Sequence, residues 1–70
     1  MLAIDTRVKL TCVDNDQVAD ATIVRLYRNR VDVALDKGGL IISLFMKKPG
    51  LYVGSHSGLE FVMQIGRAHV

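Results

Sequence analysis

Few residues in this chain could carry out catalysis. Before residue 64 there is one histidine, His56, which lies between Ser55 and Ser57 in a glycine-flanked stretch. A serine beside a histidine in sequence does not make a catalytic triad, because a triad joins side chains from elements that converge in space. His56 is interpreted as a solvated loop residue, with a ligand or partner contact as the alternative. We expect no catalytic residues and no enzymatic activity.

Metal and cofactor sites lack their required patterns. Residues 14–16 and Asp20 supply oxygen ligands of the kind that calcium prefers, but the EF-hand spacing is missing. Cys12 is the single cysteine, which excludes an internal disulfide and a multi-cysteine zinc site, and its alternating surroundings indicate a small buried hydrophobe. The glycines at 38–39 precede a predicted strand, so the helix N-terminus that would bind phosphate is absent. The sequence predicts no metal and no cofactor.

One group of basic and aromatic residues is a candidate binding patch. Its members are Arg25, Tyr27, Arg28, Arg30, Lys47 and Lys48. On one interpretation, a base stacks on Tyr27 while guanidinium groups hold phosphate. On the other, the arginines form a solvated edge that resists aggregation and pairs with nearby aspartates at 20, 32 or 36. Lys9 is expected beside the basic turn at 47–48. The net charge of +2 is too small for electrostatic capture of nucleic acid by the whole chain.

Alternating apolar residues predict the strands that would position this patch. The predicted strands are residues 7–13, 18–27, 30–36, 40–46, 51–53 and 59–63, and the predicted turns and loops are residues 14–17, 28–29, 36–39, 47–50 and 54–58. The expected inward residues are Val8, Leu10, Cys12, Val31, Val33, Leu35, Leu59, Phe61 and Met63. A β-bulge near Ile23 and Val24 reconciles two registers in the second strand.

Other positions carry more specific expectations. Asp32 and Glu60 point outward, and Asn15 and Asn29 suit positive φ in their turns. Residues 40–46 are apolar on both faces, which is typical of a buried or central strand. The pattern as a whole predicts an all-β fold, a small five- to six-stranded antiparallel barrel or strongly curled sheet.

Length and composition set the class of protein. Seventy residues allow one domain with a small core. No segment approaches the roughly 18 apolar residues that a membrane span needs. The start of the chain has neither a basic lead nor a long apolar stretch, so we expect a cytoplasmic protein without a membrane association.

The last residues of the chain are interpreted as a segment that is not native to the protein. Residues 65–70 read IGRAHV, which the codons ATC GGA AGA GCA CAC GTC would encode, a string similar to a common sequencing-adapter sequence. We therefore predict a β-barrel domain over residues 1–63 and a non-native read-through tail over residues 64–70. Arg67 and His69 then carry no functional argument, and the net charge without Arg67 is +1.

The order of strands resembles a known family. The matching segments are residues 7–10 (RVKL), 21–26 (ATIVRL), 31–35 (VDVAL), 51–54 (LYVG) and 58–61 (GLEF). Their rhythm resembles PilZ-type barrels, which bind bacterial cyclic di-GMP through R-x-x-x-R and D/N-x-S-x-x-G motifs. Only Arg7 is available for the first motif, and residues 25–30 lack the acid, serine and glycine of the second. The resemblance implies a degenerate, bacterial-type member that does not bind cyclic di-GMP and acts through protein contacts.

Three functions follow as hypotheses. The first is a non-catalytic interaction module that binds a protein partner. The alternative is a small barrel of the OB or Sm-like kind, which binds single-stranded nucleic acid through the basic and aromatic patch. The third is self-association, because a dimer or ring would bury Ile41 and Phe45, which one small core cannot accommodate.

Overall fold

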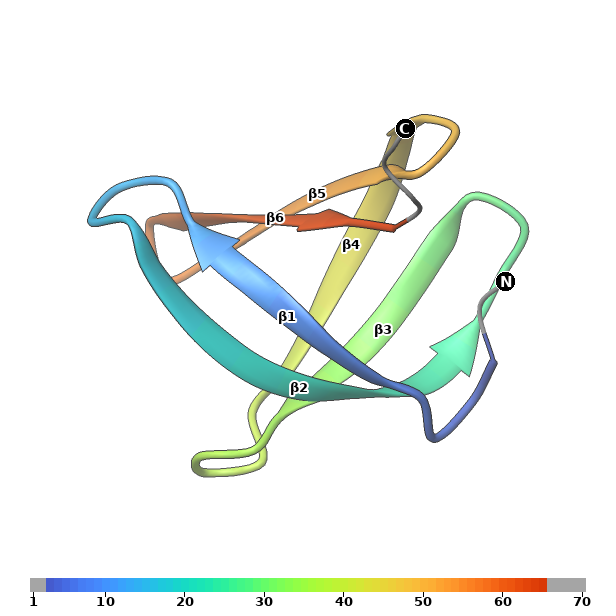
Figure 1. Ribbon diagram of the computed structural model, residues 1–70, viewed down its shortest axis with the longest axis horizontal. Helices are drawn as coiled ribbons and strands as arrows, with labels where there is room; N and C mark the ends of the chain where they lie inside the picture. The colour runs from blue at the N-terminus through green and yellow to red at the C-terminus, as the bar shows by residue number, and fades with distance from the viewer. Residues whose placement is uncertain (1–2, 66–70) are drawn as a thin grey trace.

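The chain folds as a closed six-stranded barrel. The computed structural model describes residues 3–65. Each strand pairs antiparallel with the next, and β6 returns to β1 (Figure 1). The strands are Arg7–Cys12 (β1), Gln17–Leu26 (β2), Arg30–Leu35 (β3), Ile41–Lys48 (β4), Leu51–His56 (β5) and Leu59–Gln64 (β6). The all-β prediction is confirmed, and the barrel is closed. No helix in the described part of the chain has the length and apolar character of a membrane span.

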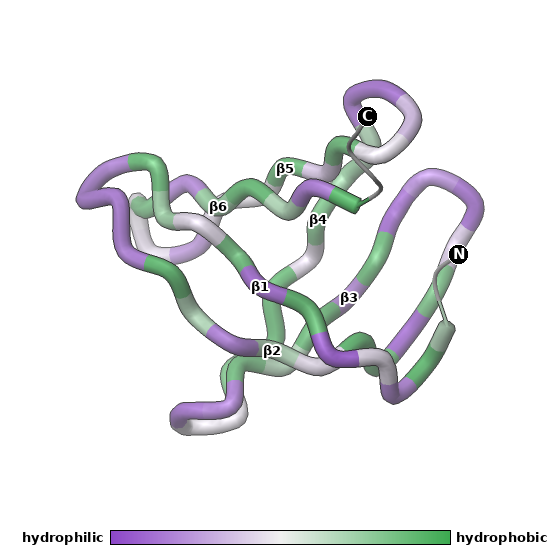
Figure 2. Tube along the Cα trace, in the orientation of Figure 1, coloured by the Kyte–Doolittle hydropathy of each residue, from purple (hydrophilic) through white to green (hydrophobic). Residues whose placement is uncertain are grey.

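A single core fills the barrel. Its buried members are Leu10, Cys12, Ala21, Ile23, Val31, Val33, Ile42, Leu44, Phe61 and Met63. Val8 and Leu35 are partly buried against it, so the period-two alternation of β1 and β3 was interpreted correctly. Figure 2 shows hydrophobic positions along the strands and hydrophilic ones at most of the turns. Leu59 is the exception among the predicted inward residues, because it lies beside the β5–β6 turn with 38% of its surface exposed.

The predicted bulge in β2 is present. The register with β3 shifts between Ile23 and Arg25, and beyond it Arg25 faces Asp32. The expectation of positive φ at Asn15 and Asn29 was wrong. Asp16, with φ of 59°, takes that conformation in the β1–β2 turn, while Oδ1 of Asn15 accepts a hydrogen bond from the Gln17 backbone N–H at 3.1 Å.

The second half of the barrel has longer strands than predicted. Residues 54–58 do not form a loop, because Ser57 and Gly58 both adopt positive φ, 53° and 80°, and make a two-residue hairpin turn. The ladder therefore continues to His56↔Leu59. Similarly, Lys47 and Lys48 belong to β4, and only Pro49 and Gly50 remain for the turn.

The outer face of β4 is exposed, so of the two predicted alternatives the strand is central, paired with β3 and with β5, and not buried on both faces. Ile42 and Leu44 fill the core, but Ile41 and Phe45 are 56% and 54% exposed. A single barrel buries only the face that points inward, and no other described element covers the outer face. Leu40 and Met46 at the ends of this stretch are exposed as well.

The predicted boundary of the tail falls inside the barrel. Gln64 is the last residue of β6 and faces Leu51. The Ile65 backbone N–H donates to the Gly50 carbonyl at 2.8 Å, and its side chain packs against the core. Arg67 and His69 lie outside the described residues, and the read-through origin stays a prediction.

Candidate binding groove over β4, β5 and β6

The two turns that carry the basic patch lie next to each other. The Met46 backbone N–H donates to the carbonyl of Asn29 at 2.9 Å, which joins the β2–β3 turn to the end of β4. Figure 1 shows the β2–β3 and β4–β5 turns on the same side of the barrel. Arg28 and Lys47, predicted as members of one patch, are thus at one end of the molecule.

The guanidinium group of Arg30 is occupied by contacts within the barrel. Its guanidinium carbon lies 4.0 Å from the centre of the Tyr27 ring, a cation–π distance. Its Nε lies 3.3 Å from Oδ1 of Asp32, without hydrogen-bond geometry, so this contact is electrostatic. Asp32 points outward as predicted, yet it is only 7% exposed, and it accepts a 2.8 Å hydrogen bond from the Ser43 hydroxyl. Arg30 therefore neutralises a buried carboxylate and covers one face of Tyr27.

Asp20 and Asp36, the other two aspartates considered as partners of the arginines, pair with residues outside the patch. Lys9 donates a 2.6 Å hydrogen bond to Asp20, and Arg7 pairs with Asp36. The hydrogen bond from Lys9, together with its charge, lowers the pKa of the Asp20 carboxyl below its ordinary value. Lys9 is thus tied to β2, and the expectation that it adjoins residues 47–48 was wrong.

Four cations of the predicted patch stay without an acidic partner in the described residues 3–65. These are Arg25, Arg28, Lys47 and Lys48. All four are exposed, so they offer positive charge to solvent or to a partner. Lys47 differs from the other three because it also lines a groove.

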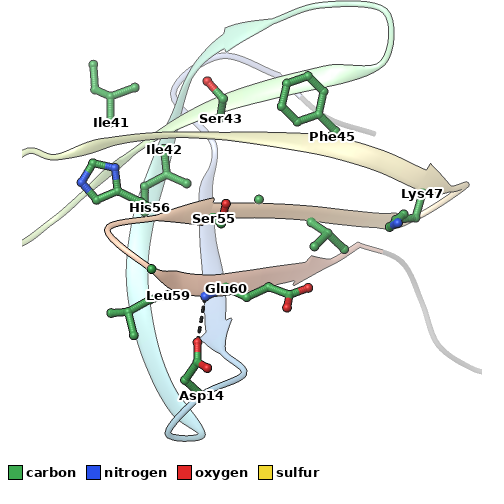
Figure 3. Close-up of a pocket in the computed structure, with 13 residues that line it drawn as sticks. Asp14, Ile41, Ile42, Ser43, Phe45, Lys47, Ser55, His56, Leu59 and Glu60 are labelled. Atoms are coloured by element: carbon green, nitrogen blue, oxygen red, sulfur yellow. Dashed lines mark hydrogen bonds between the residues drawn. The ribbon is translucent and has the colours of Figure 1, made fainter.

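An open groove of about 900 Å³ runs over the outer face of β4, β5 and β6 (Figure 3). It is lined by Asp14, Ile41, Ile42, Ser43, Phe45, Lys47, Val53, Gly54, Ser55, His56, Gly58, Leu59 and Glu60. The β4–β5 ladder ends at Phe45↔Val53, so Ile41 and Ser43 have a ladder partner only in β3. The groove lies where the two strands part.

Gly54 allows the backbones of β4 and β5 to approach closely at the point where the two strands begin to diverge. A Cβ built on Gly54 would lie 2.2 Å from the Ser43 carbonyl oxygen and 2.9 Å from Cδ2 of Leu44. Gly54 does not adopt positive φ, so the requirement for glycine is close approach of the two backbones. Beyond this contact, β5 turns toward β6 and leaves the first half of β4 uncovered.

Cross-strand pairs connect the groove to the predicted patch. Arg30 faces Phe45, Phe45 faces Val53, and Val53 faces Val62, in adjacent strands on the outer face. Phe45 is therefore flanked by a cation on one side and by aliphatic groups on the other. This surface suits a partner that offers apolar side chains together with acidic ones.

The sequence did not predict Asp14 and Glu60 as site residues, and it singled out Ile41 and Phe45 only as groups that self-association would bury. Ile41 and Phe45 carried a signal, since they are surplus apolar residues on the second face of a strand. His56, interpreted as a loop residue, is instead the last residue of β5 and lines the groove half-buried. Within residues 3–65, no three His, Cys, Asp or Glu side chains gather as a metal site would require, and Cys12 is 4% exposed.

Comparisons of the chain with protein-family models, with curated proteins and with solved structures find no match.

Proposed function

We propose that this chain is a non-catalytic protein-interaction module that binds its partner in the groove over β4, β5 and β6. The observation that carries the proposal is the exposure of Ile41 and Phe45 on β4, whose pairing with β5 ends at Phe45. Exposed apolar groups that border unpaired strand backbone are features of surfaces that accept a partner segment. The strand rhythm similar to that of PilZ barrels, without their ligand motifs, is consistent with a role in protein contacts.

The residues that line the groove indicate which contacts a partner would make. Phe45 and Ile41 would contact its apolar side chains, with Phe45 as the anchor, because large aromatic residues at the centre of a contact contribute most to affinity. The backbone of Ile41 and Ser43 would bond to an extended segment of the partner. Lys47 would attract an acidic group at one end.

Selection from a phage-displayed library of random peptides tests this function. Peptides enriched on the wild-type chain are then measured against Phe45→Ser and against Val18→Ser as the matched control. Val18 is 59% exposed on β2 and does not line the groove. We expect Phe45→Ser to weaken binding by about tenfold or more and Val18→Ser to leave it unchanged. If no peptide is enriched, or if the enriched peptides bind Phe45→Ser as well as wild type, the proposal is wrong.

A second candidate function is single-stranded nucleic acid binding, favoured by the four cations around the two adjacent turns that have no acidic partner among residues 3–65. Arg30 is not available for phosphate, because it covers Tyr27 and neutralises Asp32. A base could therefore stack only on the other face of the Tyr27 ring. The predicted patch therefore loses Arg30 and one face of the Tyr27 ring as contacts for nucleic acid. Nucleic acid binding is the weaker of the two candidate functions.

Fluorescence anisotropy of labelled oligo(dT) separates the two functions. Nucleic acid binding requires an affinity that falls steeply between about 50 and 200 mM salt and that drops in the Arg28→Ala and Tyr27→Ala double variant. No binding at the lower salt concentration removes this candidate.

A further inference from the structure

The groove carries opposite charges in different places. Lys47 lies at the end of β4, whereas Asp14 and Glu60 lie across the groove on the side of β1 and β6 (Figure 3). Within residues 3–65, neither Lys47 nor Glu60 has an ion-pair partner. The carboxylate of Asp14 accepts a 2.9 Å hydrogen bond from the Glu60 backbone N–H, which fixes the acidic side of the groove next to β6.

We propose that the occupant of the groove is a second copy of this chain, related to the first by a two-fold axis. This proposal rests on the function proposed above. In a two-fold dimer each patch meets its complement twice. Lys47 of one copy then faces the acidic side formed by Asp14 and Glu60 of the other, and the same pair forms again across the axis.

The apolar part of the groove fits the same arrangement. Ile41 and Phe45 project from β4, the strand that also carries Lys47, and Leu59, 38% exposed, lies across the groove from them on the side of Glu60 (Figure 3). Gly58 contributes no side chain to the lining, and a Cβ there would meet nothing within 4 Å, which leaves room for an aromatic side chain of the other copy. A second copy would therefore cover the apolar groups that the single barrel leaves in water.

Self-association also fits the size of the chain. A 70-residue barrel has a small core, and small domains gain stability when they bury further apolar surface by association. A standard interface covers about 800 Å² of each copy, roughly one sixth of the 4733 Å² that this barrel exposes. The groove spans the outer faces of three of the six strands, so an interface of that size would centre on the groove and extend over the adjoining outer face.

Charge reversal tests the proposal on the full chain. Sedimentation velocity from about 10 µM to 1 mM protein measures the dimer dissociation constant of wild type, Lys47→Glu, Glu60→Lys and the double variant. Because each substitution converts two attractions per dimer into repulsions, we expect each single variant to weaken the dimer by roughly tenfold to thirtyfold. The double variant, and an equimolar mixture of the two single variants, restore it. Glu60 is chosen over Asp14 because the Asp14 carboxylate accepts a hydrogen bond from the Glu60 backbone, whereas the Glu60 carboxylate has no hydrogen-bond partner in the described part of the chain.

The matched control is Lys48→Glu. It changes the net charge as Lys47→Glu does, but Lys48 does not line the groove. We expect dimerisation of Lys48→Glu to equal that of wild type, and circular dichroism of all variants checks that the barrel is intact.

The outcomes distinguish this proposal from the function on which it rests. A wild-type chain that is monomeric at about 1 mM, or single variants that dimerise like wild type, or a double variant that is no better than the singles, would overturn the dimer. If peptides selected on the groove still depend on Phe45 in that case, the interaction module stands and its occupant is another protein. If neither dimer nor peptides are found, both proposals fall.

Discussion

Replacement of Gly54 by alanine is the most direct test of the close approach between the backbones of β4 and β5. The added Cβ would lie 2.2 Å from the Ser43 carbonyl oxygen, and Cβ contacts shorter than 3.0 Å are essentially not seen. The strands must therefore separate by about 0.8 Å at this point, or the core around Leu44 must shift. Neither neighbour can rotate away, because the oxygen belongs to backbone and Leu44 is fully buried.

The size of the effect follows from this geometry. Overpacking of this kind costs about 2–3 kcal/mol. Domains of this length unfold with a free energy of roughly 4–10 kcal/mol, so the variant loses a large share of its stability. We expect the melting temperature to fall by roughly 10–20 °C, measured by circular dichroism together with urea titration.

The Gly58→Ala variant is the control. Gly58 adopts φ of 80°, and a Cβ there meets nothing within 4 Å, so its cost is that of the left-handed conformation, about 1 kcal/mol. Gly54→Ala should be the more damaging of the two. Without the steric contact, alanine at Gly54 would stabilise the chain by about 0.4–1 kcal/mol, because it restricts the unfolded state. A neutral or stabilising Gly54→Ala would thus refute the argument.

Three further predictions follow from contacts within the chain. Asp32→Ala should lower the unfolding free energy by about 1–3 kcal/mol in urea titration, because it leaves the partly buried Arg30 without its acidic partner, and an unchanged midpoint would contradict the role of this pair. Leu44→Ala should cost about 2–5 kcal/mol in the same assay, since the side chain is fully buried, whereas a cost below about 1 kcal/mol would mean that the core is not packed as described. Because the pKa of Asp20 is lowered in the folded state, its pair with Lys9 stabilises the fold above the pKa of the unfolded carboxyl, and the contribution is lost as pH falls through the folded pKa. An NMR titration of Asp20 in Lys9→Ala should show its pKa raised toward the ordinary value; an unchanged pKa would rule out Lys9 as the main cause.

The candidate site was only partly predictable. The sequence placed Arg28 and Lys47 in one patch, and the structure brings their turns together. It left the aspartates at 20, 32 and 36 open as partners of the arginines. The structure pairs Arg30 with Asp32, whereas Asp20 and Asp36 pair with Lys9 and Arg7. The sequence did not predict the groove, since Asp14 and Glu60 lie 46 residues apart in the chain.

The sequence by itself determined the strands and the inward face of the barrel. Alternation is a property of neighbouring residues, so Val31 and Val33 could be assigned to the core from the order of residues alone. The β2 bulge followed from the same argument, because one strand cannot bury two registers. Tertiary structure alone decided what happens on the outer face, where each environment depends on the strands alongside. Asp32 and Phe45 both point outward, yet neighbouring side chains bury Asp32 whereas Phe45 is exposed to water. The two residues differ because the space above each one depends on how far the adjacent strands diverge.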